Sequence, residues 1–465
     1  MKISKNIFRA YDIRGLYKKD ISPEIFYKIG IATGNYVKKG SSEKHIAVGN
    51  DIRKTSYTLT HAFISGVSST GTNVTYFGTT AFGQTLFKGW ELKQDLIVYI
   101  TASHLPPEWN GIKFYYRDGV GLPEEELMKI RDYTLNEESN IVDWKQVGTV
   151  NFIDPKKSYK DFFQSKFHYN KKLRVALDCG GASMTLSAPE VFKNVEINTI
   201  PVFCKPDPSF SNRPSDPKPK NLNVLVDTVK KNDCDFGVAF DGDGDRSVIV
   251  DNTGKILSAD ETGIILGKYG ISRNRGTIIV NVECSKAIEE QLSPLGFNIK
   301  QINVGHTFLT LHAKKEKSPL GIESSGHLIL PEYFLFDDAM VVPLKIAEIL
   351  DKTGKTLEEL LREVPIYPIK KEEIECDDHI KFDVVDKLKN NIKTEFEDTN
   401  TLDGIRINLD EGWVLIRPSN TSPIIRLTTE ADDETVLNQL STKFKKRTEE
   451  IIEEIKDMNY DGLLK

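Results

Sequence analysis

The sequence predicts an α/β fold in which one structural unit occurs three times, with an α+β unit at the end of the chain. Three segments share a plan of a β-branched apolar run, a polar turn, a helix-like stretch and a second apolar run. The two apolar runs of these units begin at His45 and Asn73, at Leu173 and Val195, and at Gly276 and Phe297. Strands that alternate with helices indicate βαβ units, whose sheets carry helices on both faces. Since the units are spaced by about a hundred residues or more, they are too far apart for a solenoid and fit three related domains.

The last part of the chain has a different pattern. Residues 402–431 alternate apolar and polar positions with turn residues between them, and residues 434–458 show the pattern of an amphipathic helix. Polar or proline-rich stretches follow Ile153, Val250 and Pro365, where they interrupt helix and strand patterns alike. We therefore predict four domains, at 1–150, 151–252, 253–366 and 367–465.

Composition and charge exclude several classes of protein. The chain has 62 basic and 68 acidic residues and a formal net charge of −6, so it lacks the basic field that holds nucleic acid or an anionic membrane. No run approaches the roughly 18 apolar residues of a membrane span, and charges stand where a signal peptide needs an apolar segment. The five cysteines form no CxxC pair, which disfavours a disulfide framework and a zinc site. We expect a cytoplasmic protein with no nucleic-acid or membrane partner.

Three carboxylates alternate with glycines directly after the apolar run 236–240. Asp241, Asp243 and Asp245 can converge as hard oxygen ligands because the glycines let the backbone bend, and such ligands suit Mg²⁺. An EF-hand is excluded because its sixth loop position, which needs glycine, is Arg246. The alternative is an ordinary Asp-Gly turn, but clustered carboxylates repel one another unless a cation joins them. The pattern therefore predicts a divalent-cation site.

A serine and a histidine stand side by side after the apolar run 96–100. Ser103 lies where a strand is expected to end, which is where open α/β sheets place their ligand sites. The loop lacks the G-x-S-x-G elbow, and His104 is the next residue and so is badly placed as the base of a hydrolase triad. Taken alone, a Ser-His pair in a proline-rich loop is more often a turn than a nucleophile.

Two further loops carry groups that suit sugars and phosphates. Glu323, Ser325 and His327 stand on a glycine-flanked loop, and their carboxylate, hydroxyl and imidazole suit sugar hydroxyls, which both donate and accept hydrogen bonds. The segment 417–423, RPSNTSP, with Arg426 beyond it, combines guanidinium, hydroxyl and amide groups, as a phosphate clamp requires. Both patterns are also compatible with ordinary turns. The sequence has no P-loop, no G-x-G-x-x-G helix start and no HExxH, which weakens kinase and dehydrogenase interpretations.

Six motifs, in this order, resemble those of the α-D-phosphohexomutase family, and specifically its phosphomannomutase/phosphoglucomutase branch. They are FRAYDIRG from Phe8, the Ser103-His104 loop, DGDGDR from Asp241, VGH from Val304, ESSGH from Glu323 and RPSNTSP from Arg417. The resemblance runs the length of the chain. It implies three related α/β domains with mixed sheets plus a C-terminal α+β domain around a central cleft, in agreement with the repeated units.

The resemblance also implies an activity. The chain would be an intramolecular phosphotransferase that interconverts the 1-phosphate and 6-phosphate of mannose, glucose or both, through a phosphorylated Ser103 and a hexose 1,6-bisphosphate, which would also be its activator. One Mg²⁺ per chain would be held by Ser103, Asp241, Asp243 and Asp245. The partner would be a small phosphosugar, and the chain a monomer or weak homodimer.

The resemblance assigns roles to individual residues. Those implied for catalysis are Ser103, His104, Lys113, Arg14 and Arg246. Lys113 is the candidate general acid/base, because desolvation beside cations can bring the pKa of an ammonium towards neutrality. Those implied for substrate binding are Tyr11, His306, Glu323, Ser325, His327, Arg417, Ser419, Asn420, Thr421 and Arg426.

Two residues depart from the family pattern, and three other functions stay open. Leu105 stands where Asn is commonest, and Glu283 stands where the mannose/glucose branch often has Lys, which reverses the charge near the expected sugar-phosphate site. A phosphoglucosamine mutase would use the same chemistry on an amino sugar, although such enzymes more often carry Gly-Asp where this chain has Gly-His306. A phosphatase with an aspartyl nucleophile would need Thr or Val in place of Asp245 and leaves Ser103 without a role. A non-catalytic sugar-phosphate binder is indicated only by Leu105 and Glu283.

Overall fold

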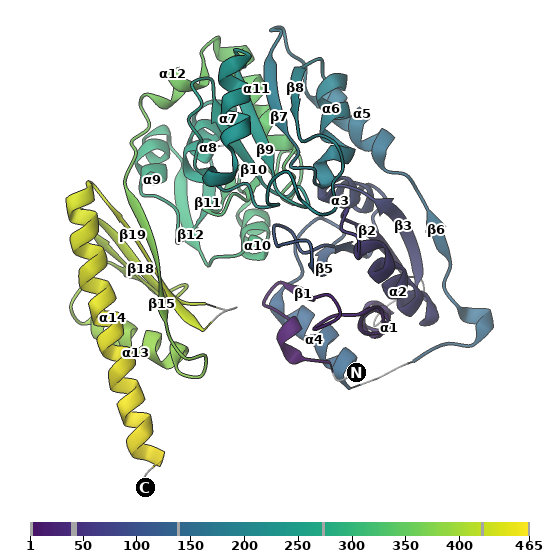
Figure 1. Cartoon of the computed structure of the whole chain (residues 1–465), viewed down its shortest axis with the longest axis horizontal. Coiled ribbons are helices and arrows are strands. Elements are labelled where there is room, and N and C mark those ends of the chain that lie inside the picture. Colours follow the sequence, from purple (N-terminus) through teal and green to yellow (C-terminus); the bar gives the residue numbers. More distant parts are fainter. Residues whose placement is uncertain (1–2, 39–43, 137–139, 272–274, 420–422, 464–465) are drawn as a thin grey trace.

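The computed structural model describes residues 3–38, 44–136, 140–271, 275–419 and 423–463, with side chains up to residue 457. Its described strands form four sheets that follow one another along the chain in an arc (Figure 1). The first three sheets mix parallel and antiparallel pairs and carry helices, and the fourth is antiparallel. The predicted fold class is confirmed, whereas the exact domain boundaries remain predictions.

The first sheet has six strands in the order β1-β5-β4-β2-β3-β6. Its strands are β1 Asp12–Leu16, β2 His45–Asn50, β3 Asn73–Thr79, β4 Leu96–Ile100, β5 Trp109–Tyr116 and β6 Val150–Phe152. Its helices are α1 Pro23–Lys38, α2 Ser56–Ser69, α3 Phe82–Glu91 and α4 Glu124–Leu135. The apolar strand β4 is buried along its whole length, as expected where helices cover both faces of a sheet. β1 pairs antiparallel with β5, which sets Asp12 opposite Lys113 and brings the first motif beside the strand that follows the serine loop.

The second and third sheets repeat the predicted unit. The second has the order β10-β9-β7-β8 and the third the order β12-β11-β13-β14. The elements around the second sheet are α5 Lys156–Lys166, β7 Arg174–Asp178, α6 Ala188–Asn194, β8 Asn198–Val202, α7 Asn223–Lys231, β9 Phe236–Phe240 and β10 Ser247–Asp251. Those around the third are α8 Ala259–Ile265, β11 Thr277–Asn281, α9 Ala287–Leu292, β12 Asn298–Ile302, α10 His306–Glu316, β13 Gly321–Ile322, β14 Leu328–Ile329, α11 Val341–Thr353 and α12 Leu357–Leu361. In all three units the two predicted apolar runs pair as parallel neighbours: β2 with β3, β7 with β8, and β11 with β12.

The fourth sheet has the order β15-β19-β18-β17-β16 and only antiparallel pairs. Its elements are β15 Ile369–Glu375, α13 Lys381–Lys393, β16 Thr399–Asn400, β17 Ile405–Leu409, β18 Gly412–Pro418, β19 Ile424–Ala431 and α14 Glu434–Leu463. The long α14 lies along the outside of this sheet, beside α13 (Figure 1). Short helical turns elsewhere are η1 Lys5–Ile7, η2 Trp144–Gln146, η3 Ser183–Leu186, η4 Pro219–Asn221, η5 Leu266–Gly270 and η6 Ser293–Leu295.

A hydrophobic cluster joins the first three units, which also have smaller clusters of their own, and the fourth unit has a separate core. One continuous cluster joins Phe82 of the first unit, Phe163 of the second and Leu344 of the third. The fourth unit has its own cluster, which includes Val414 and Phe444. Burial of apolar surface is the main source of stability, so the first three units form one packed body to which the fourth is attached.

No helix in the described part of the chain is long and apolar enough to cross a membrane.

Candidate active site

The serine loop joins β4 to β5 and is held in one conformation. Ser103 is buried and has a φ of +53°, in the left-handed region that side chains other than glycine seldom adopt. Its amide donates to Thr101 Oγ1 at 2.9 Å, and its carbonyl accepts a hydrogen bond from Arg53 Nη2 at 2.7 Å. A conformation of this kind is typical of functional sites, and it presents the serine hydroxyl at a fixed place.

Arg53 anchors this loop and was missed by the sequence reasoning. Its buried guanidinium also donates to the carbonyls of Leu105 at 2.7 Å and Pro106 at 2.5 Å. Its charge is balanced by Asp51, whose Oδ2 accepts from Arg53 Nε at 2.9 Å. The available signal was the polar stretch directly after β2, because ligand sites of open sheets lie at the carboxyl ends of their strands.

The three aspartates of the DGDGDR motif lie between β9 and β10, directly against the serine loop. Gly242 packs so closely that a Cβ there would lie 2.2 Å from the carbonyl oxygen of Ser103. Asp241 Oδ2 accepts a hydrogen bond from Ser103 Oγ at 3.3 Å. Ligand oxygens of Asp241, Asp243 and Asp245 lie within 4.8 Å of one another. The structure therefore brings together the predicted nucleophile and the predicted metal ligands from two domains.

Burial and mutual repulsion shape the electrostatics of this aspartate triad. Burial and the neighbouring carboxylates raise the pKa of Asp241 well above its usual range, and they also raise the pKa of Asp243. Burial opposes ionisation of Asp245 as well, but Lys113, His327 and Arg246 outweigh it and hold the pKa of Asp245 well below its usual range.

Lys113, on β5, places its ammonium between two of the aspartates. Its Nζ lies 2.9 Å from Asp243 Oδ2 and also pairs with Asp245 Oδ2. Burial would lower the pKa of Lys113, but the two carboxylates outweigh it and hold the pKa well above its usual range. This direction is opposite to the one expected from the sequence, because the carboxylates come from the second domain. Lys113 is here a counter-ion of the triad, and its role as general acid/base stays a prediction.

The triad has the donors that a divalent cation takes. Asp243 Oδ1 and Asp245 Oδ1 are buried and accept no hydrogen bond from any described residue. Buried carboxylate oxygens without donors are costly, and a bound cation removes that cost. Since hard oxygen ligands suit Mg²⁺, the residues present fit such an ion.

Two arginines surround the triad and the loops beside it. Arg246 Nε donates to Asp241 Oδ2 at 3.2 Å, and Arg246 Nη1 donates to the carbonyl of Ser325 at 3.1 Å. Arg246 therefore links the DGDGDR loop of the second domain, residues 241–246, to the loop of residues 321–327 in the third domain, which we call the sugar loop. Arg14 Nε donates to Asp12 Oδ2 at 2.6 Å, on the strand next to Lys113.

His104 faces the serine hydroxyl. Its Nδ1 lies 3.4 Å from Ser103 Oγ. Burial and the charges of Arg246 and Arg14 lower the pKa of His104 to about 2, so that its ring is neutral in the structure.

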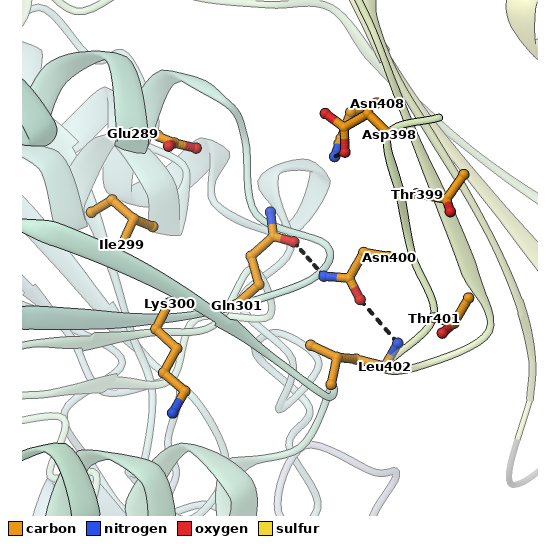
Figure 2. A pocket seen from close by; sticks show the side chains of 10 residues that line it. All are labelled: Glu289, Ile299, Lys300, Gln301, Asp398, Thr399, Asn400, Thr401, Leu402 and Asn408. Carbon is orange, nitrogen blue, oxygen red and sulfur yellow. Dashed lines mark hydrogen bonds between the residues drawn. The ribbon is translucent and has the colours of Figure 1, made fainter. Parts of the chain in front are cut away.

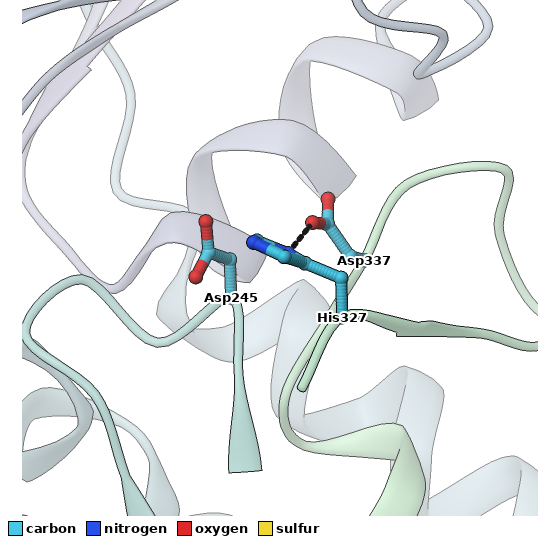
Figure 3. Close-up of side chains that lie close together, drawn as sticks. All are labelled: Asp245, His327 and Asp337. Carbon is cyan, nitrogen blue, oxygen red and sulfur yellow. Dashed lines mark hydrogen bonds and ion pairs between the residues drawn. The ribbon is translucent and has the colours of Figure 1, made fainter. Parts of the chain in front are cut away.

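His327 points toward the aspartate triad. Its ring stands between Asp337 and Asp245 (Figure 3), and its Nδ1 is hydrogen-bonded to Asp337 Oδ2. Burial would lower the pKa of His327, but Asp245 and Asp337 raise it to about 9. His327 was expected as a sugar contact beside Glu323. The main chains of the two residues do hydrogen-bond, at 2.9 Å, but the imidazole pairs with Asp337, which belongs to none of the six motifs.

The sugar loop and the start of α10 form one hydrogen-bonded unit. Glu323 Oε1 accepts from Ser325 Oγ at 2.6 Å, and Glu323 Oε2 accepts from the Gly305 amide at 3.0 Å. Gly305 has a φ of +140°, and a Cβ there would lie 2.7 Å from the ring of Tyr11. The ring of His306 meets that of Tyr11 edge-on at 6.0 Å between centroids, and burial lowers the pKa of His306 to about 4. Four predicted substrate residues thus lie together.

The phosphate clamp of the fourth domain faces this unit through Arg417, near the end of β18. Arg417 is buried, and its Nη1 lies 3.2 Å from Glu283 Oε1 and its Nη2 3.1 Å from Asp403 Oδ2. Burial would lower the pKa of Arg417, but the two carboxylates raise it. The sequence placed Glu283 near the sugar-phosphate site, whereas no motif pointed to Asp403.

The other predicted clamp residues are only partly described. The amide of Ser419, which is buried, donates to the carbonyl of Ile424 at 3.0 Å. Arg426 on β19 is the register partner of Arg417, so both side chains stand on the same face of the sheet. Asn420 and Thr421 lie outside the described residues.

A cavity of about 800 Å³ lies between the first and fourth domains. Tyr11 and Asp403 stand on its wall, and Tyr11 also packs on Gly305 at the start of α10. A second hollow, of about 640 Å³, lies between β12 and the loop around β16 (Figure 2), where Asn400 Nδ2 donates to Gln301 Oε1 at 2.8 Å. Its lining includes none of the predicted site residues, whereas the cavity of about 800 Å³ is lined by one of them, Tyr11.

Four family descriptions match consecutive parts of the chain: Phosphoglucomutase/phosphomannomutase alpha/beta/alpha domain I over residues 5–141, domain II over 157–254, domain III over 258–367, and the C-terminal domain over 373–447.

Curated relatives match over nearly their whole length. A protein of Methanopyrus kandleri named probable phosphoglucosamine mutase is 31% identical over 97% of this chain and 99% of its own. A phosphomannomutase/phosphoglucomutase of Pseudomonas putida is 32% identical over 95% of each chain. Among solved structures, a phosphoglucomutase/phosphomannomutase family protein of Burkholderia thailandensis superposes with a TM-score of 0.89 at 24% identity, covering 97% of this chain and 98% of that one.

Proposed function

The chain belongs to the α-D-phosphohexomutase family, and on this basis we propose that it interconverts the 1-phosphate and 6-phosphate of glucose, mannose or both through a phosphorylated Ser103. As a family member it is an intramolecular phosphotransferase, the class to which its curated relatives belong. The hexose, the residue that carries the phosphoryl group and the activator are parts of the proposal.

The observation that carries the proposal is the position of the Ser103 hydroxyl. It is buried at 3.3 Å from Asp241 Oδ2, at the point where the serine loop and the aspartate triad meet. An aspartyl phosphatase would leave this serine without a role, and a binding protein would have no need of a strained, anchored hydroxyl. A mutase uses it as the place where the phosphoryl group waits between two transfers.

The chain's own residues support each stage of the transfer. In the first, the P–O bond to Ser103 Oγ breaks as a new one forms to the free hydroxyl of a hexose monophosphate, whose proton is released. The resulting hexose 1,6-bisphosphate turns over in the cleft and returns its other phosphoryl group to Ser103, so that no phosphate is gained or lost. His104, whose neutral ring lies 3.4 Å from Ser103 Oγ, is the candidate to accept and return the proton. Lys113, predicted as the general acid/base, is charged beside the triad and could therefore act first as a proton donor.

Asp241, Asp243 and Asp245 would hold one Mg²⁺ together with the phosphate on Ser103, and such an ion neutralises oxygens on which charge develops during phosphoryl transfer. Arg246 and Arg14 supply fixed positive charge on the same side of the cleft. Glu323 and Ser325 would bind sugar hydroxyls, and Arg417 would bind the phosphate that is not reacting. Hexose 1,6-bisphosphate would act as the activator, because it can load an unphosphorylated Ser103.

A second candidate, the glucosamine phosphates, is favoured by one feature of the site. Glu283 places a carboxylate beside Ser324 of the sugar loop, and a carboxylate is a natural partner for an amino group. Glucosamine is also named in the archaeal relatives, and neutral hexoses in the Pseudomonas relatives. His306, which resembles the mannose/glucose branch, is the reason to place the neutral hexoses first.

The proposal is tested by supplying glucose 1-phosphate, mannose 1-phosphate and glucosamine 1-phosphate in parallel, each with Mg²⁺ and a trace of glucose 1,6-bisphosphate. The expected result is appearance of the 6-phosphate of glucose or mannose without release of inorganic phosphate. Turnover of glucosamine 1-phosphate alone would make the second candidate correct. Release of free phosphate would identify a phosphatase, and no turnover with any of the three would overturn the proposal.

A further inference from the structure

Glu283 forms a contact that links the third and fourth domains at the mouth of the phosphate clamp. It follows β11 and is largely buried. Its Oε1 lies 3.2 Å from Arg417 Nη1, and its Oε2 accepts a hydrogen bond from Ser324 Oγ at 3.2 Å. Lys371 of β15 stands on the other side, with Nζ 3.5 Å from Glu283 Oε2. One carboxylate is thus shared by two cations and the sugar loop.

The contact leaves Arg417 neutralised before any substrate arrives. Asp403 Oδ2 occupies its second amino group at 3.1 Å, while Arg417 Nε is buried and donates to no described residue. Burial would keep Glu283 protonated, but Lys371 and Arg417 lower its pKa, so the carboxylate is charged. These four side chains carry two positive and two negative charges, and their sum is zero.

Of the two carboxylates that pair with Arg417, Glu283 is the one that can leave it. Asp403 is also fixed by the main-chain amide of Val304, which donates to the same Oδ2 at 3.2 Å. Glu283 already has a second cation, Lys371, whose side chain is 55% exposed and therefore free to follow it. A carboxylate that leaves Arg417 for Lys371 stays paired, so the move costs little.

We propose that Glu283 is a positioning residue that occupies Arg417 in the empty cleft in the place of a substrate phosphate, and that it moves to Lys371 when the phosphate binds. This inference rests on the proposed function. Each catalytic cycle requires Arg417 to release one phosphate of the bisphosphate and to take the other after the sugar has turned. A carboxylate that returns to Arg417 lowers the cost of that release, because Arg417 Nη1 is then not left buried without a partner.

The test compares Glu283→Gln with Glu283→Asp and with Glu348→Gln, a control that removes a carboxylate paired with Lys345 and Lys352 on α11. Binding of glucose 1-phosphate and of inorganic phosphate is measured by calorimetry on the full chain, and kcat and KM are measured separately. For Glu283→Gln we expect the Kd of both ligands to fall about fivefold, because the competing charge is gone. We expect kcat to fall with KM, because the phosphate is released more slowly. Glu283→Asp keeps the negative charge and should have kcat and KM values close to those of the wild type.

Unchanged or weaker binding in Glu283→Gln would overturn the inference, as would a change equally large in Glu348→Gln. Weaker binding of glucose 1-phosphate with unchanged binding of inorganic phosphate would also overturn it, because Glu283 would then contact the sugar directly. If the wild type turns over no hexose phosphate but Glu283→Gln still binds phosphate more tightly than the wild type, the exchange at Arg417 is supported and the mutase function is rejected. The two failures are therefore distinguishable.

Discussion

The serine loop with its aspartate triad and the phosphate clamp are held in place by different means. Ser103 and Asp241 meet inside the body formed by the first three domains, which share one hydrophobic core. Arg417 stands on the fourth domain, which has a separate core and reaches the third domain through ion pairs and a small apolar cluster around Trp413.

The difference matches the two tasks that a mutase must perform. Transfer of a phosphoryl group needs reacting atoms fixed to within a fraction of an ångström, and a shared core with buried anchors such as Arg53 provides this. Binding the distal phosphate in two orientations needs partners that can be exchanged, and charge-balanced ion pairs provide that. Changes to the serine loop, its anchors and the aspartate triad should therefore affect kcat or folding, whereas changes to the groups that bind the sugar and the distal phosphate should affect binding.

The largest effect is expected from Ser103→Ala, which removes the proposed phosphoryl carrier. Mutase activity should fall by about a thousandfold or more, because no other group can hold the phosphoryl group between the two transfers. Binding of glucose 1-phosphate, measured by calorimetry, should change little because the clamp is intact. Retained activity would contradict the comparison, since the chemistry would then lie outside the serine loop.

Arg53→Met tests whether the body is as firmly built as its hydrogen bonds indicate. The change leaves Asp51 buried without its cation and frees three carbonyls of the serine loop, so we expect a loss of stability of about 3–5 kcal/mol. The midpoint of urea unfolding measures it. Arg117→Met, which breaks an exposed pair with Asp95, is the control and should cost less than about 1 kcal/mol. Equal losses would show that the serine loop does not depend on Arg53.

Reasoning from the residues alone predicted what is local, and the meeting of Ser103 with the aspartates of another domain was expected only from the family resemblance. The repeated βαβ units, and the grouping of Asp241, Asp243 and Asp245, could be predicted because strands, turns and alternating carboxylates are written in consecutive residues. The anchoring by Arg53 could not, since its acceptors are main-chain carbonyls some fifty positions further on. The pKa of Lys113 was expected to be lowered, but it is raised. The two carboxylates that raise it belong to another domain, so no residue near Lys113 in the sequence indicated them.

Asp241→Asn separates the metal-dependent chemistry from the fold. The substitution removes one of three buried, mutually repelling carboxylates, so the chain without metal should be at least as stable as wild type. Activity with Mg²⁺ should fall about a hundredfold. Thermal unfolding with and without Mg²⁺ checks the cause: the wild type should be stabilised by the ion, and the variant should not. An equal Mg²⁺ effect in both would place the ion elsewhere.

Ser325→Ala sharpens the contrast on the side that binds the sugar. Ser325 Oγ donates to Glu323 Oε1 at 2.6 Å, and its side chain is exposed to the cleft, so little stability depends on it. We expect KM to rise about tenfold with kcat nearly unchanged, because the variant loses one hydrogen bond to the sugar. Such a bond contributes about 1.4 kcal/mol, which corresponds to a tenfold change in affinity. Ser324→Ala, whose hydroxyl points to Glu283 instead, is the matched control. A large fall in kcat would mean that the sugar loop also takes part in the transfer step.

The smallest effect is expected from Asp338→Asn, at the joint of the three domains that form the body. Asp338 accepts hydrogen bonds from the Tyr159 hydroxyl at 2.9 Å and the Met340 amide at 3.0 Å, and burial raises its pKa to about 7. Because the unfolded chain releases this proton near pH 4, only the folded state holds it between pH 4 and 7, so stability should fall as the pH rises through that window and level off above it. Asparagine keeps an acceptor for both donors and has no proton to lose, so the variant should lose about 1.3 kcal/mol less than wild type between pH 6 and 8. Urea unfolding at pH 5, 6, 7 and 8 in metal-free buffer measures the difference, with the exposed Asp161→Asn as control. Parallel profiles for wild type and Asp338→Asn would show that the folded state holds no extra proton at Asp338 and that this joint makes no pH-dependent contribution to stability.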